Sequence, residues 1–225
     1  QMPEEINRVL TDHACDLLLA PTELAMENLQ AEGLSERSNL VGDVMADLLA
    51  SCRESLEPAS IRDSLRLDGD YLVATVHRAS NTDDPEQLAH LMEAMAGLAM
   101  TVVLVAHPRL VAAAQRWGIP LATGAIQPVE PLDYLSMLSL LVGSRGLITD
   151  SGGLQKESFL LGVPCTTLRT ESEWPETLAG GMNVLSPKGE NLKELVTRAV
   201  PPPATQPYGD GDAAERIANL LLTLA

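Results

Sequence analysis

Apolar and polar positions follow two recurring patterns along the chain. Short, continuous apolar runs, typical of strands buried on both faces, are separated by longer segments whose apolar positions recur at helical spacing. The runs cover residues 17–20, 71–76, 102–105, 146–149 and 164–168. Strands that are separated by helices pair in parallel through right-handed crossovers, with helices on both faces of the sheet. The pattern therefore predicts an α/β fold with a doubly wound parallel sheet.

The helix expected from Asp84 has a clear start signal. Asp84 can cap the first turn, Pro85 follows at the first helical position, and Glu86 adds a favourable negative charge. Leu88 and Leu91 then begin an apolar stripe at helical spacing. Further helices are predicted in three places: from Pro3, over residues 22–33 and over residues 212–224.

The same patterns divide the chain into three parts. Residues 1–47 are expected to be the tail of a preceding lobe and its connection, because they hold only two helices and one strand. Residues 48–203 carry the alternating pattern of the main domain, and residues 204–225 are expected to be a closing helix after a stiff run of prolines. The chain begins with Gln1, so we expect it to start within a longer protein.

Composition narrows the class of protein. A 225-residue chain with 45% hydrophobic and 20% charged residues is globular. Its net charge of −16 argues against nucleic acid and against membranes as partners, and its apolar stretches are shorter than the ~20 residues of a membrane span. Three cysteines without C-x-x-C spacing imply neither a zinc site nor a disulfide framework, so a cytoplasmic location fits best.

Candidate chemistry gathers where the apolar runs end. In parallel sheets, ligands bind at the carboxyl ends of the strands. His77 and Arg78 follow one run, and His107, Pro108 and Arg109 follow another. A single histidine is more often a structural hydrogen-bonding group, but two such clusters at one sheet edge favour a functional role.

Residues 150–157 form the strongest local signal. Gly152 and Gly153 follow Ser151 where a strand end is predicted to turn into a helix, and the first N–H groups of that helix could bind a phosphate. Glu157 would lie one to two turns further on, where it could accept hydrogen bonds from a ribose. The alternative is a plain tight turn followed by a solvated glutamate.

Several motifs occur together in the order and spacing of one family. The sequence resembles the bacterial non-hydrolysing UDP-N-acetylglucosamine 2-epimerases over nearly its whole length. The motifs are His77-Arg78-x-x-Asn81, His107-Pro108-Arg109, Asp150-Ser151-Gly152-Gly153-Leu154-Gln155-Lys156-Glu157, residues 162–169, Glu173-Trp174-Pro175-Glu176-Thr177, residues 3–12, 41–45 and 208–211.

The resemblance implies a GT-B-like fold in which this chain supplies the Rossmann-like C-terminal lobe and the end of the N-terminal lobe. It implies interconversion of UDP-N-acetylglucosamine and UDP-N-acetylmannosamine by elimination and re-addition of UDP, with no metal or other cofactor, in a protein that forms homodimers. Its implied catalytic residues are Glu4, Arg8 and His77. Its implied substrate-binding residues are Arg78, His107, Arg109, Ser151, Gly152, Gly153 and Glu157.

Some features leave alternatives open. Ser80 stands where the family usually has a glutamate, which removes a carboxylate close to the expected site. Trp174 could form a wall of the nucleotide pocket or pack against the neighbouring helix. A GT-B glycosyltransferase, a hydrolysing relative or a UDP-binding module without activity would share the same nucleotide pocket.

Overall fold

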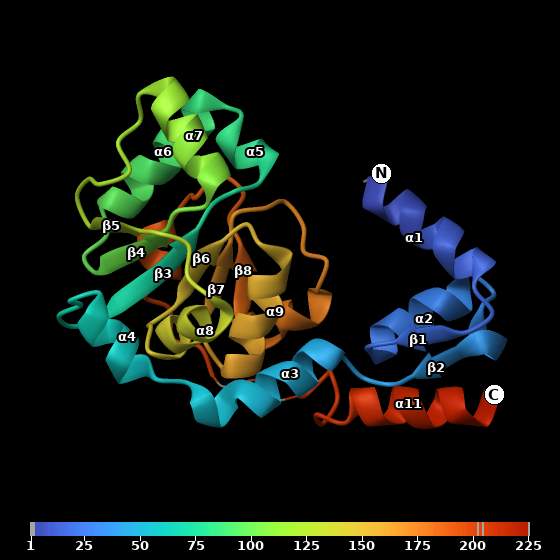
Figure 1. Cartoon of the computed structure of the whole chain (residues 1–225). Helices are drawn as coiled ribbons and strands as arrows, with labels where there is room; N and C mark the ends of the chain where they lie inside the picture. The colour runs from blue at the N-terminus through green and yellow to red at the C-terminus, as the bar shows by residue number, and fades with distance from the viewer. Residues whose placement is uncertain (1–2, 202, 204, 225) are drawn as a thin grey trace. The chain divides into compact units, whose positions relative to one another are not determined.

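The structure is a computed structural model that describes residues 3–201, 203 and 205–224. It contains two compact units (Figure 1). The first consists of Gln1–Arg53 and Thr205–Ala225, and the second of Glu54–Ala204. The three-part division expected from the sequence stays a prediction.

The second unit contains a six-stranded parallel sheet with the strand order β5-β4-β3-β6-β7-β8. Four of these strands lie at apolar runs identified in the sequence, whereas β5 and β8 were not predicted. The strands are β3 (Tyr71–Thr75), β4 (Thr101–Val105), β5 (Ile126–Val129), β6 (Leu147–Thr149), β7 (Cys165–Thr167) and β8 (Asn183–Leu185).

Helices connect these strands. The expected start of α6 is confirmed: Asp84 accepts hydrogen bonds from the N–H groups of Glu86 at 2.9 Å and Gln87 at 3.2 Å, and Pro85 is the first helical residue. The helices are α4 (Pro58–Ser64), α5 (Ala79–Thr82), α6 (Pro85–Ala96), α7 (Pro108–Trp117), α8 (Tyr134–Val142), α9 (Gly152–Leu161) and α10 (Leu192–Leu195), with 3-10 segments at η2 (Arg53–Ser55) and η3 (Pro175–Gly181).

Alternate side chains of β3 enter two separate cores, one on each face of the sheet. Leu72 and Ala74 pack in a cluster that includes residues of α6, α7 and α10. Tyr71 and Val73 pack in a second cluster with residues of α4, α8 and α9. Figure 1 shows α6 and α7 on one side of the sheet and α8 and α9 on the other. The doubly wound α/β architecture is therefore confirmed.

The strand order places a switch point between β3 and β6. From β3 the chain adds β4 and β5 on one side, and then returns to add β6, β7 and β8 on the other. At such a point the loops that leave two neighbouring strands diverge to opposite faces, which leaves a crevice at their carboxyl ends. A ligand site is expected there.

The first unit is smaller and contains a two-stranded parallel sheet. Its strands pair Leu18 with Ser38 and Ala20 with Leu40. The helices expected from Pro3 and near residues 22–33 are present. The elements are α1 (Pro3–Ala14), β1 (Leu18–Ala20), α2 (Glu23–Ala31), η1 (Ser35–Arg37), β2 (Ser38–Leu40), α3 (Val44–Cys52) and α11 (Ala213–Leu224).

Asp47 on α3 fixes the start of α11. Its carboxylate accepts hydrogen bonds from the N–H groups of Ala213 at 3.2 Å and Ala214 at 2.7 Å. These N–H groups lie at the positive end of the helix dipole, where a negative charge is favourable. The C-terminal segment is thereby joined to the N-terminal elements. Among the described residues, no helix is both long and apolar enough to cross a membrane.

Candidate nucleotide-binding site

A buried aspartate organises the switch point. Asp150, which follows β6, is 0% exposed. It accepts hydrogen bonds from the N–H groups of His77 (3.0 Å to each oxygen) and Arg78 (2.8 Å) and from the Asn81 side-chain amide (3.0 Å). Burial opposes ionisation of Asp150, but the hydrogen bonds from His77, Asn81 and Arg78 outweigh it and hold the pKa of the carboxyl below its usual value. Asp150 is therefore an ionised anchor for the loop after β3.

The same aspartate orients the ring of His77. His77 Nδ1 lies 3.1 Å from Asp150 Oδ1. Because the carboxylate can only accept, Nδ1 carries the proton of the neutral ring and Nε2 keeps a lone pair. The ring of His107 lies close by, with 5.2 Å between the two ring centroids. The two histidine clusters expected at one sheet edge thus meet.

His107 itself has a structural partner. It is the N-cap of α7, and its Nδ1 accepts a hydrogen bond from the N–H of Arg109 at 3.1 Å. Its ring is thereby held at the start of the helix beside His77. His107 therefore makes a structural hydrogen bond, and the same bond holds its ring beside His77, where it could also take part in the site.

The loop after β6 begins α9 at Gly152. Ser151 is the N-cap, and its own N–H donates to Thr149 Oγ1 at 3.0 Å. By helix geometry, the N–H groups of Gly152, Gly153 and Leu154 have no carbonyl one turn back to bind. These free N–H groups lie at the positive end of the helix dipole, where an anion is favourable. The expected phosphate-binding element is present as a helix start.

Two charged side chains of α9 are buried behind this start. Glu157 is 7% exposed, and burial raises the pKa of its carboxyl, although a hydrogen bond with Tyr134 and the charge of Lys156 act in the opposite direction. Lys156 is 2% exposed, and its Nζ lies 3.8 Å from the centroid of the Trp174 ring. The solvated glutamate of the alternative interpretation is thus excluded. Trp174 packs against α9 through this cation–π contact.

An ionic cluster lies beside the helix start. Arg78 Nη2 pairs with Glu173 Oε1 at 3.2 Å, and Arg169 pairs with the other oxygen of the same carboxylate. Burial works against ionisation of Glu173, but Arg169 outweighs it and lowers the pKa of the carboxyl. Glu173 lies close to Gly152, since a methyl group built on Gly152 would lie 3.0 Å from Glu173 Oε2.

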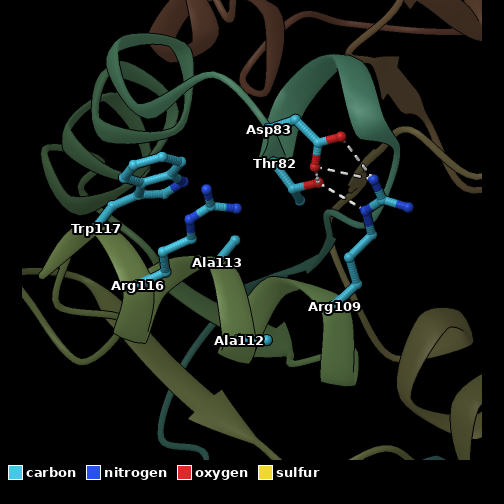
Figure 2. A pocket seen from close by; sticks show the side chains of 7 residues that line it. All are labelled: Thr82, Asp83, Arg109, Ala112, Ala113, Arg116 and Trp117. Atoms are coloured by element: carbon cyan, nitrogen blue, oxygen red, sulfur yellow. Dashed lines mark hydrogen bonds and ion pairs between the residues drawn. The ribbon is translucent and has the colours of Figure 1, made fainter.

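Arg109 lines a pocket that is formed by residues of α5 and α7, which Figure 2 shows from close by. Its Nε donates to Thr82 Oγ1 at 2.9 Å, and its Nη2 donates to both oxygens of Asp83 at 2.9 and 2.8 Å. The pocket has a volume of about 240 Å³, and the guanidinium of Arg116 lies over the ring of Trp117 in its wall. Within the described residues, the charge of Arg109 is therefore matched by Asp83.

The remaining predicted residues lie in the first unit. Arg8 on α1 pairs with Glu5 at 2.7 Å, Asp12 at 2.7 Å and Glu32 at 2.6 Å. Glu4 lies in the first turn of α1, and its side chain is outside the described part of the chain. A role for either residue beside His77 stays a prediction.

The sequence analysis assigned no role to five residues that organise the site. A signal existed for Asp150, because a carboxylate directly after a buried strand and before a glycine pair is well placed to bind loop N–H groups. For the charged side chains in the ionic and cation–π contacts, no sequence pattern distinguishes them from ordinary surface charges. The five residues are Asn81, Asp150, Lys156, Arg169 and Glu173.

The second unit belongs to the doubly wound α/β class, in which ligands bind at the switch point. Its switch point holds a glycine-led helix start, a buried glutamate and a histidine anchored by an aspartate. The chain matches the family model described as UDP-N-acetylglucosamine 2-epimerase over residues 1–222. It belongs to the UDP-N-acetylglucosamine 2-epimerase family.

Relatives and solved structures agree with this assignment. The chain is 39% identical to the UDP-2,3-diacetamido-2,3-dideoxy-D-glucuronate 2-epimerase of Pseudomonas aeruginosa, covering 100% of this chain and 64% of the relative. It is 35% identical to the UDP-N-acetylglucosamine 2-epimerase of Methanocaldococcus jannaschii over 98% of this chain and 64% of the relative.

A crystal structure of the Methanocaldococcus jannaschii UDP-GlcNAc 2-epimerase in complex with UDP-GlcNAc and UDP aligns with a TM-score of 0.87 at 33% identity, over 99% of this chain and 65% of that chain. The expected fold, a Rossmann-like C-terminal lobe of a GT-B-like protein, is thereby confirmed. The chain spans about 64% of the length of these curated relatives.

Proposed function

We propose that the second unit binds UDP at the start of α9, as the nucleotide-binding part of a UDP-sugar 2-epimerase. The observation that carries the proposal is the meeting of three elements at one switch point: the Ser151 helix start, the buried Glu157 and the loop anchored by Asp150. Phosphate groups would accept hydrogen bonds from the first N–H groups of α9. Glu157 would accept hydrogen bonds from the ribose.

His77 is suited to handle a proton near the departing diphosphate. Asp150 accepts a hydrogen bond from His77 Nδ1, which leaves Nε2 as the ring nitrogen that can take up a proton. An imidazolium so formed could donate that proton to a phosphate oxygen as the C1–oxygen bond breaks. Because loss of UDP makes the C2 proton of the sugar more acidic, the same event would prepare the inversion at C2.

The names of the relatives point to two candidate substrates for the whole protein. UDP-N-acetylglucosamine, with UDP-N-acetylmannosamine as its epimer, is the first candidate, because the family and the structure with a TM-score of 0.87 carry that sugar nucleotide in their names. A UDP-2,3-diacetamido-2,3-dideoxyglucuronate is the second candidate, because the Pseudomonas aeruginosa relative, at 39% identity, is named for it. Incubating each nucleotide sugar with the protein and detecting the epimer by NMR distinguishes them.

Calorimetry with UDP tests the nucleotide site. Glu157→Gln should weaken UDP binding by about 1.5–3 kcal/mol, because a charged hydrogen bond is lost. Gly153→Val should weaken it as well, because a side chain would keep the phosphate away from the helix start. Glu93→Gln, at an exposed position of α6, removes the same charge and should leave UDP affinity unchanged. Unchanged UDP affinity in both site variants would refute the proposal.

Salt dependence provides a second measurement on the same protein. If Arg78 attracts the diphosphate, UDP affinity should fall as the salt concentration rises. An affinity that is independent of salt would mean that neutral backbone donors carry the recognition.

We further propose that the 225 residues bind UDP without epimerising its sugar. Inversion at C2 needs an acid and a base on opposite faces of the ring, and Glu4 alone cannot supply both. The purified chain should therefore incorporate no solvent deuterium at C2 of UDP-N-acetylglucosamine. Deuterium at C2 would show that the 225 residues already contain a complete catalytic set.

The assembly and the compartment are part of the same proposal. A homodimer follows from the family resemblance, and light scattering after gel filtration would detect it. Cys15, Cys52 and Cys165 are free thiols, which suits a reducing compartment such as the cytoplasm.

A further inference from the structure

A carboxylate of the chain itself lies at the helix start proposed for the diphosphate. A methyl group built on Gly152 would lie 3.0 Å from Glu173 Oε2 and 3.7 Å from Arg78 Nη2. Both charged groups therefore lie against the first residue of α9. They come from the loops that follow β7 and β3, strands that flank β6 on either side.

The same positively charged groups would stabilise Glu173 and a bound diphosphate. The start of α9 attracts a negative charge, and Arg78 supplies a positive one. A second anion at this place would be repelled by the carboxylate and would compete with it for the guanidinium. One of the two ion pairs of Glu173 must therefore change when a diphosphate binds.

The two arginines differ in how firmly they hold Glu173. Arg169 lies four residues from Glu173 in the same segment, and its side chain is largely buried. Arg78 belongs to a separate loop, its side chain is partly exposed, and its ion pair with Glu173 is 3.2 Å long. Arg78 is therefore the partner that can leave.

We propose that Glu173 is a resident counter-anion of the nucleotide site: it holds Arg78 while the site has no ligand, and Arg78 moves from Glu173 to the diphosphate of the nucleotide on binding. This inference rests on the proposed function, since it assumes a diphosphate at the start of α9. Glu173 thereby weakens binding of UDP, and it offers Arg78 a partner when UDP departs. Glu173 therefore affects the affinity for the diphosphate part of the ligand and not for the nucleoside part.

Binding of UDP and of uridine to Glu173→Gln tests this role. Glutamine keeps the shape and one acceptor oxygen but removes the charge, so UDP should bind about three- to tenfold more tightly than to the parent chain. Uridine, which has no phosphate, should bind with unchanged affinity. Glu171→Gln is the matched control, because Glu171 is exposed in the same loop and should leave both affinities unchanged.

A double variant shows whether Arg78 carries the effect. If Arg78 is the group that is released, Glu173→Gln should raise UDP affinity much less in the Arg78→Gln background than in the parent chain, because only the direct repulsion by Glu173 is left to remove. An equal gain of affinity in both backgrounds would overturn the exchange.

The outcomes also separate this inference from the proposed function. If the parent chain binds UDP and Glu173→Gln binds it equally or more weakly, Glu173 is not a counter-anion, but the proposed nucleotide site is still supported. A parallel change in uridine and UDP affinity would show a structural role and would also overturn the inference. If neither protein binds UDP, the proposed site fails and the inference fails with it. Binding of UDP by the variant alone would support both.

Discussion

The two units bury their apolar side chains to different degrees. In the second unit, helices cover both faces of the sheet, and the β3 residues Leu72 and Val73 are fully buried. In the first unit, Leu19 in the middle of β1 is 38% exposed, and Leu222 on α11 is 75% exposed. A parallel sheet excludes water from its strands only where both faces are covered. The second unit meets this condition on its own.

The contrast extends to polar groups. The second unit contains a buried, ionised network around Asp150, and such a network is favourable only where every donor and acceptor has a partner. In the first unit the ion pairs of Arg8 lie in partly exposed surroundings. We therefore expect changes in the second unit to cost more stability than comparable changes in the first.

The largest effect is expected from Asp150→Ala. It leaves the N–H groups of His77 and Arg78 without their acceptor and removes one of the two acceptors of the Asn81 amide, which should cost about 4 kcal/mol in the free energy of unfolding. Urea denaturation measures this cost. Asp68→Ala, at an exposed position, is the control. A loss below about 1 kcal/mol would show that water replaces the carboxylate.

The free energy of unfolding of the same variant should also depend on pH differently from that of the parent chain. In the folded chain the pKa of the Asp150 carboxyl lies below its usual value, so the ionised group stabilises the fold at neutral pH. This contribution should be lost as the pH falls below about 4 toward the folded-state pKa. Between pH 5 and pH 3 the parent chain should therefore lose more stability than the variant. Equal losses would contradict the lowered pKa.

Matched leucine truncations compare the two cores directly. Leu91→Ala opens a cavity in the large core of the second unit and should cost about 3 kcal/mol. Leu29→Ala affects the small cluster of the first unit, which water and neighbouring side chains can fill, and should cost about 1 kcal/mol. Equal costs in urea denaturation would mean that the first unit is packed as tightly as the second.

A smaller effect is expected at the start of α11. Asp47→Ala removes the acceptor of the Ala213 and Ala214 N–H groups and should cost about 1 kcal/mol, the usual cost of a lost helix cap. Hydrogen exchange of the α11 amides should become faster while that of β3 is unchanged. Asp16→Ala, an exposed aspartate of the same unit, serves as the control.

The smallest effect is expected at Leu222. Because its side chain already faces solvent, Leu222→Gln should change the free energy of unfolding by less than about 0.5 kcal/mol. Removing an exposed apolar group should also reduce self-association in light scattering. A loss of more than 1 kcal/mol would indicate that Leu222 is covered in solution.

Much of the fold followed from local patterns. Continuous apolar runs such as residues 102–105 predicted central strands, because a strand that is buried on both faces has no polar side. β5 contains Gln127 and Pro128 and is only partly buried, so its pattern resembles a loop. β5 and β8 lie at the two edges of the sheet, where burial leaves a weaker signal.

The sequence by itself determined the parallel α/β architecture, the strand ends that carry histidines, and the glycine-led start of α9, because each depends on residues that are adjacent in the chain. Only the tertiary structure decided that Asp150 is the anchor of the His77 loop, that Arg109 pairs with Asp83, and that Glu173 lies against Gly152. These contacts join loops from different strands. Their partners depend on which strands become neighbours and on which side chains lose water, and neither is encoded in local spacing.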